Sequence, residues 1–164
     1  MEKTAIKNAA VSVRASAYAE VMQLRLRRLD PTVSLPGYAT AGAAGFDLAA
    51  ARDVTVAPGQ MALVPTGLVV EVPPEYFLAI FARSSTPLKR GLVVANGVGV
   101  VDSDYAGPAD EVRIPVLNVT GQEVMVHRGD RIAQGIILPA PRVEWAEVSE
   151  LRQESRGGFG ATGR

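Results

Sequence analysis

Short apolar segments that alternate with polar residues recur along the chain from residue 23 onward, and they constrain the fold more than any other feature. The main segments are separated at short intervals by Gly, Pro, Asn or Asp, and they read "QLRLRRL", "DVTV", "MALVPTGLVVEV", "YFLAIFAR", "EVRIPVLNV", "EVMVH" and "RIAQGIILP". A repeat of two is the spacing of a β-strand with one buried face, and closely spaced turn residues separate short strands. The pattern therefore predicts an all-β protein built as a sandwich, a barrel or a jelly roll.

Two local features qualify this pattern. One turn of helix is expected around residues 85–90, whereas the spacing of Trp145, Val148 and Leu151 is too weak to predict another helix. Pro115 stands inside a strand-like segment. Because proline cannot donate a backbone hydrogen bond to a neighbouring strand, we expect an edge strand or a bulge there.

Size and charge narrow the class of protein. A chain of 164 residues with 48% hydrophobic content is long enough for one domain with a real core. Seventeen basic side chains balance seventeen acidic ones, and His127 is the sole histidine. Without net charge, neither nucleic acid nor an anionic membrane is expected as a partner. The apolar runs are too short to span a membrane and cysteine is absent, so we expect a cytoplasmic protein.

The two ends of the chain differ from the middle. Residues 1–22 are rich in alanine and are expected to form a flexible extension, which would leave residues 23–152 as the folded domain. Residues 153–164 are rich in glycine, which loses the most backbone entropy on ordering, so we expect a mobile arm. This arm also carries Phe159, Thr162 and two arginines, which are suited to stacking on a base and holding phosphate.

The segment "ARSSTPLKRG" has the groups that a polyphosphate needs. Arg83 offers a guanidinium fork, Ser84 and Ser85 offer hydroxyls, and Lys89 and Arg90 follow closely. We interpret this segment as a phosphate cradle. A solvated turn is the alternative when the segment is taken by itself.

The segment "VVDSDYAG" places an acid directly after a pair of valines. A carboxylate fixed at a strand end is a suitable base to activate water beside a phosphorus atom held by the cradle, and Asp102 is the candidate. The alternative for Asp102 is a capped turn. Asp104 is expected to be structural.

Three further segments carry candidate residues. In "AGAAGFDLAA", Asp47 should face away from Phe46 and Leu48 on a strand, where an acid near phosphates can hold waters of a bound Mg²⁺. In "NGVGV", the Asn96–Gly97 pair by itself predicts a tight hairpin turn. In "RGDRIAQ", Asp130 and Arg131 are expected to form an ion pair in the site wall, and His127, just before it, should be a surface or half-buried histidine.

The segments "NGVGV" and "VVDSDYAG" run together as "NGVGVVDSDYAG", so with "RGGFGATG" near the C-terminus there are five segments. Their order and spacing resemble the five motifs of the trimeric dUTP diphosphatase (dUTPase) family. The resemblance covers roughly residues 23–163, and five ordered matches are far more specific than any one of them. It implies a single-domain jelly roll or distorted β-barrel that assembles as a homotrimer with shared sites. It also implies Mg²⁺-assisted hydrolysis of dUTP to dUMP and pyrophosphate, which keeps uracil out of DNA and supplies dUMP for thymidylate synthesis.

The resemblance also implies a role for each candidate residue. Asp102 would activate the water that attacks the α-phosphorus, and the ring of Tyr105 would exclude a 2′-hydroxyl from the sugar site. Asp47 would contact Mg²⁺ through water. The other implied substrate contacts are Arg83, Ser84 and Ser85 for the phosphates, Asn96, Gly97 and Val98 for uracil with Gln134 in support, and Arg156, Phe159, Gly160 and Thr162 from the arm.

The chain departs from the family pattern in places, and two other functions are therefore considered. The step from Arg156 to Phe159 is shorter than in the commonest form of the last motif, and "RSST" also resembles dCTP deaminases of the same fold. A deaminase needs a glutamate near the position of Pro115, which this chain lacks. The second alternative is a homologue that binds nucleotide or a protein partner without catalysis. The presence of Asp102, Arg83, Tyr105 and Phe159 argues against it.

Overall fold

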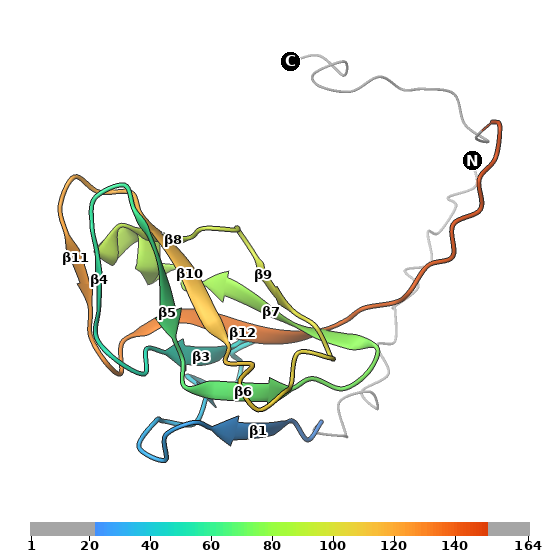
Figure 1. Cartoon of the computed structure of the whole chain (residues 1–164), viewed down its shortest axis with the longest axis horizontal. Coiled ribbons are helices and arrows are strands. Elements are labelled where there is room, and N and C mark those ends of the chain that lie inside the picture. The colour runs from blue at the N-terminus through green and yellow to red at the C-terminus, as the bar shows by residue number, and fades with distance from the viewer. Residues whose placement is uncertain (1–21, 151–164) are drawn as a thin grey trace, which may run out of the picture.

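The computed structural model describes residues 22–150, and within them it places twelve strands and one short helix (Figure 1). The strands are β1 (Arg25–Arg28), β2 (Gly37–Tyr38), β3 (Phe46–Ala49), β4 (Val54–Val56), β5 (Met61–Pro65), β6 (Leu68–Glu71), β7 (Tyr76–Ala82), β8 (Leu92–Val94), β9 (Gly99–Val101), β10 (Arg113–Asn118), β11 (Val124–Val126) and β12 (Arg131–Pro139). The helix, η1 (Thr86–Arg90), lies between β7 and β8. The expectation of an all-β chain with at most short helices is confirmed, including the helical turn near residues 85–90.

The strands form two main layers. The larger sheet has the order β2-β3-β12-β7-β9, and the smaller one has the order β5-β10-β8. Two-stranded sheets, β1-β6 and β4-β11, extend these layers at their margins, and both pairs are visible in Figure 1. All these pairs are antiparallel. The connections cross between layers repeatedly, so segments far apart in the sequence become neighbours in a sheet.

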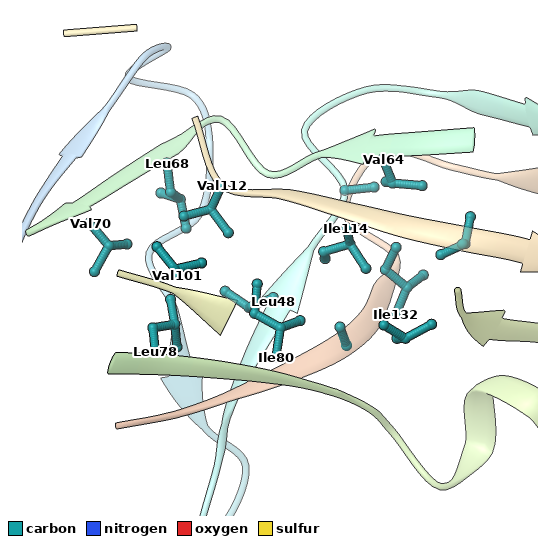
Figure 2. Close-up of a cluster of buried hydrophobic side chains, with 14 of the residues drawn as sticks. Leu48, Val64, Leu68, Val70, Leu78, Ile80, Val101, Val112, Ile114 and Ile132 are labelled. Atoms are coloured by element: carbon teal, nitrogen blue, oxygen red, sulfur yellow. The ribbon is translucent and has the colours of Figure 1, made fainter. Parts of the chain in front are cut away.

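The core lies between the two layers (Figure 2). From the larger sheet, Leu48, Leu78, Ile80 and Ile132 are fully or almost fully buried, and from the opposite side come Val64, Leu68, Val70, Val112 and Ile114. Burying each of these side chains stabilises the fold by roughly 1.5–3 kcal/mol. This packing makes a rigid scaffold on which the strand ends are held.

Strand β3 illustrates how the alternation positions a polar group. Phe46 and Leu48 are buried, and Asp47 between them faces the outer side of the sheet, as expected. In register, Asp47 lies opposite Gln134 of β12, which in turn lies opposite Phe81 of β7. The outer face of three adjacent strands therefore carries these side chains next to one another.

The prediction for Pro115 is wrong. Its strand, β10, lies in the centre of the three-stranded sheet, and its register with β5 and β8 shows no shift. The pairing with β8 extends only from Val116 to Asn118, and the Pro115 carbonyl accepts a hydrogen bond from Ala95 at 2.9 Å. The N–H and C=O groups of one strand residue point to the same side. The N–H that Pro115 lacks would therefore point past the end of β8, and the ladder between β10 and β5 loses no hydrogen bond.

Residues 140–150 follow β12 without helix or strand, and Trp145 is almost fully exposed there. The weak pattern through this segment therefore forms no helix as far as residue 150. Across residues 22–150, no helix has the length and apolar character needed to cross a membrane.

Candidate active site

The turn after β7 carries the predicted phosphate cradle. The Arg83 carbonyl accepts a hydrogen bond from the Thr86 amide at 2.9 Å, which closes the turn. The buried Thr86 hydroxyl donates to the Ile132 carbonyl at 2.8 Å and so fixes the turn to β12. Ser84 is exposed and Ser85 is half-buried at the start of η1. The turn therefore presents hydroxyls to solvent from a rigid base.

Asp47 and Arg131 hold the guanidinium of Arg83. Nε of Arg83 lies 2.7 Å from Oδ1 of Asp47, and its Nη1 donates to the carbonyl of Arg131 at 3.2 Å. The second carboxylate oxygen of Asp47 lies 2.9 Å from Nη1 of Arg131. The Asp47 carboxylate is therefore shared by two guanidinium groups. Its side chain is only 14% exposed, so this position is partly desolvated.

The predicted ion pair between Asp130 and Arg131 is wrong. Asp130 instead lies 2.7 Å from Nη1 of Arg90 and accepts the amide of His127 at 2.8 Å. Neighbouring residues of an extended chain point to opposite sides, so the two side chains diverge. Burial raises the pKa of Asp130, but the hydrogen bonds from Arg90 and from the His127 amide and the nearby positive charge outweigh it, and the pKa lies below its usual value.

Gln134 supports the end of β7 from the neighbouring strand. Its Nε2 donates to the carbonyl of Ala82, directly before Arg83, at 3.2 Å. A Cβ atom built on Gly45 would lie 3.1 Å from the Gln134 side-chain oxygen, so the side chain fits closely against β3. The structure thus brings the side chains of Asp47, Arg83 and Gln134 close to the end of β7.

The turn predicted at Asn96–Gly97 is present, but it does not join a hairpin. The Gly97 amide donates to the Val94 carbonyl at 3.0 Å, and Gly97 has a φ of 72°, which favours glycine. The flanking strands pair elsewhere, since β8 pairs with β10 and β9 pairs with β7. Asn96, Gly97 and Val98 are all exposed on this connection between the two layers.

Asp102 and Tyr105 line one cavity. Asp102 directly follows β9, its side chain is exposed, and its carbonyl accepts the Tyr105 amide at 3.2 Å. The cavity has a volume of about 440 Å³, and Leu63, Val100 and Arg113 also line it. An exposed carboxylate beside an aromatic ring and a guanidinium can accept a proton from water near a bound anion.

Glu111 is a residue that the sequence analysis missed. Its carboxylate accepts hydrogen bonds from the Gly67 amide at 2.8 Å and from Nε of Arg113 at 2.9 Å. Its backbone carbonyl accepts the Tyr105 hydroxyl at 3.3 Å. Glu111 therefore anchors the loop that carries Asp102 and Tyr105. An acid just before an apolar strand was the only sequence signal for it.

The cradle and Asp102 are far apart within one chain. Val101 of β9 lies opposite Leu78 of β7, whereas Arg83 follows the other end of β7. The five residue-to-residue steps from Leu78 to Arg83 span about 16 Å of extended strand. The structure therefore places Arg83 directly after one end of β7 and Asp102 beside its other end.

The remaining candidates divide into two groups. His127 is mostly exposed, with Nδ1 3.8 Å from a carboxylate oxygen of Asp53, so the expectation of a surface histidine is confirmed. The four arm residues lie outside the described residues, as do residues 1–21.

The comparisons with known proteins agree with the motif pattern. The sequence model of the dUTPase family matches residues 32–163. This chain belongs to the dUTPase family. The deoxyuridine 5′-triphosphate nucleotidohydrolase of Desulfotalea psychrophila is 43% identical to it, over 80% of this chain and 89% of that protein. The protein of the same name from Desulfitobacterium hafniense is 46% identical, over 83% of this chain and 91% of its own length.

The solved structures include a dUTPase of similar architecture. The crystal structure of the dUTPase from Streptococcus mutans superposes with a TM-score of 0.69 at 35% identity, over 76% of this chain and 100% of that one. The predicted jelly roll of the dUTPase family is thereby confirmed. Membership of this family favours the hydrolase over the deaminase and over a non-catalytic homologue.

Proposed function

We propose that this protein hydrolyses dUTP to dUMP and pyrophosphate. The observation that carries the proposal is the exposed carboxylate of Asp102 in one cavity with Tyr105, in a chain of the dUTPase family. Such a carboxylate can accept the proton of a water molecule that attacks the α-phosphorus. The new bond joins the water oxygen to the α-phosphorus, the bond to the oxygen bridging the α- and β-phosphates breaks, and pyrophosphate leaves.

The cradle holds the phosphate chain in this proposal. Arg83 donates N–H groups to phosphate oxygens, and the hydroxyls of Ser84 and Ser85 add hydrogen bonds. The contacts of Arg83 with Asp47 and with the Arg131 carbonyl support this role, because they fix the guanidinium before substrate arrives. Fixed geometry lowers the entropic part of the barrier.

Substrate choice depends on two other segments. The ring of Tyr105, whose hydroxyl is tied to the Glu111 carbonyl, packs against deoxyribose and leaves no room for a 2′-hydroxyl. The exposed turn at Asn96, Gly97 and Val98 offers backbone groups that distinguish uracil from cytosine, with Gln134 in support.

The C-terminal segment completes the site. We place Phe159 on the uracil ring, and Arg156, Gly160 and Thr162 on the phosphates. In this proposal residues 153–164 form an arm that closes over bound nucleotide and excludes water from the reacting groups, and residues 1–22 form an extension of the folded domain.

We propose a homotrimer with shared sites, and the separation of the cradle from Asp102 within one chain supports sharing between chains. One chain would supply the cradle, a second would supply Asp102 with the uracil turn, and the third would supply its arm. Exposed apolar side chains support such an assembly: Met61 and Leu63 of β5 are exposed and share a face with the half-buried Leu117 of β10. Leu63 and Val100 are 56% and 59% exposed and line the Asp102 cavity. A contact there would bring a neighbouring cradle to Asp102.

Mg²⁺ is proposed to arrive with the triphosphate. The described part of the chain has no group of three or more His, Cys, Asp or Glu side chains that could hold a metal ion. Asp47 is the carboxylate that we assign to an ion that keeps its waters and binds mainly to phosphate oxygens, although its two oxygens lie 2.7 and 2.9 Å from guanidinium nitrogens of Arg83 and Arg131. Bound in this way, Mg²⁺ would neutralise charge on the phosphates, and Asp47 would contact it through water.

Product analysis tests the proposal. Pyrophosphate and dUMP should appear from dUTP but not from dCTP, dTTP or UTP, whereas ammonia would indicate a deaminase. Asp102→Asn should still bind dUTP and lose turnover by about 100-fold or more, the usual effect of removing a general base. Unchanged turnover in this variant would remove Asp102 from the mechanism. In a cell this activity would belong to the cytoplasm, where it lowers dUTP and supplies dUMP.

A further inference from the structure

Arg131 contacts the cradle in two ways, and the proposed substrate contacts above use only its backbone carbonyl. Its Nη1 lies 2.9 Å from Oδ2 of Asp47, and its carbonyl accepts a hydrogen bond from Arg83 at 3.2 Å. Both contacts converge on the arginine that we place on the phosphate chain. We propose that Arg131 is a positioning residue for phosphate binding, which acts on Arg83 through Asp47 and through its own carbonyl. This inference rests on the proposed function.

A bulge in β12 places Arg131 on the correct face. Gln134 lies opposite Asp47, and Arg131 lies three positions before Gln134, so regular alternation would point Arg131 to the other side. The register shifts between Arg131 and Ala133, and Arg131 lies opposite Ala49, two residues from Asp47. A bulge redirects a side chain in this way, and it often does so beside active sites.

The contacts leave Arg83 fixed but still able to bind. A guanidinium has five N–H donors, and here Nε is directed to Asp47 and one N–H of Nη1 to the Arg131 carbonyl. The other donors remain for phosphate oxygens. Because an arginine held in one rotamer before binding loses less freedom when the ligand arrives, this arrangement favours affinity.

Charge gives Arg131 a second role. Asp47 alone would cancel the positive charge of Arg83, and it is only 14% exposed, so water screens it weakly. With Arg131 added, the three side chains carry a net positive charge. The carboxylate can then orient Arg83 without repelling an incoming anion.

Binding of pyrophosphate tests this role without turnover. Titration calorimetry with EDTA present, which removes any bridging metal, should show that Arg131→Gln weakens pyrophosphate binding about tenfold. Arg131→Lys, which keeps a charge opposite Asp47, should retain most of the affinity. The control is Arg25→Gln, which removes one charge from the exposed Arg25–Glu71 pair and should leave binding unchanged. Melting temperatures of all variants identify any loss of fold.

A double variant decides between acting through Asp47 and touching phosphate directly. In Asp47→Asn with Arg131→Gln, the local charge becomes positive again and the asparagine oxygen can still accept from Nε of Arg83. Recovery to within about threefold of the unmodified affinity is expected. A loss that persists beyond that of Asp47→Asn alone would show that Arg131 binds phosphate itself, and unchanged binding by Arg131→Gln in a folded protein would also overturn the inference. Failure of the proposed function would show separately, as no pyrophosphate from dUTP with the unmodified protein.

Discussion

Mixing two inactive variants should restore activity if each site is shared between chains. Arg83 and Asp102 lie at opposite ends of β7, at least about 16 Å apart within one chain. This separation of backbone positions is longer than either side chain, and we therefore assign the two groups of one site to different chains. We therefore expect Arg83→Gln and Asp102→Asn to be inactive alone and to complement each other when co-assembled.

The size of the effect follows from symmetry. In a cyclic assembly, each site would take Arg83 from one subunit and Asp102 from its neighbour. With equal, random mixing, a site has both intact groups with a probability of about one half times one half, or about one quarter. The co-assembled protein should therefore show about 25% of the unmodified activity, while each variant alone should show about 1% or less.

The assay is pyrophosphate release from dUTP by the co-expressed variants, purified together. The matched control is the double variant co-assembled with unmodified protein. This mixture should also retain about one quarter of the activity if sites are shared, and about one half if each chain has its own site. Activity no greater than the average of the separate variants would refute the shared site.

Three further predictions concern packing, acid stability and the C-terminal segment. Gly135→Ala places a Cβ 2.5 Å from the Phe46 ring and should lower the free energy of unfolding in urea by about 1–3 kcal/mol. Gly37→Ala, which has open space around its Cβ, should leave the free energy of unfolding unchanged. Equal stabilities of the two variants would contradict this packing. Because its contacts lower the pKa of Asp130, the stability that they supply is present above about pH 4 and is lost as the pH falls through the lowered value. Asp130→Asn should therefore lower the melting temperature at pH 7 and show a smaller further fall in melting temperature between pH 7 and pH 3 than the unmodified protein. Parallel curves of melting temperature against pH for the two proteins would argue against the ion pair. Removal of residues 156–164 should lower turnover more than stability, and a large fall in melting temperature would contradict a role in closing the site.

The sequence by itself determined the local features of this protein. Alternation in a strand depends only on neighbouring residues, so the outward direction of Asp47 and the buried positions of Phe46 and Leu48 were predictable. The helical turn near residues 85–90 was also local. The order of the five motifs indicated the family, because an ordered set of short matches rarely arises by chance.

Contacts between distant segments were decided only by the tertiary structure. The sequence paired Asp130 with its neighbour Arg131, whereas the fold gives Asp130 to Arg90 and Arg131 to Asp47, from elements about 40 and about 80 residues away in the chain. The expected edge position of Pro115 failed for the same reason, because strand order depends on which surfaces pack together and not on composition.

The candidate site shows both contributions. The sequence determined which side chains have the right chemistry, since a guanidinium, hydroxyls and a carboxylate are properties of residues. The register of β3, β7, β9 and β12 decided that Arg83 meets Asp47 and Arg131, and that Asp102 lies at the far end of β7. Register is set by hydrogen bonds between strands and by burial across the whole sheet, and no short stretch of sequence contains that information.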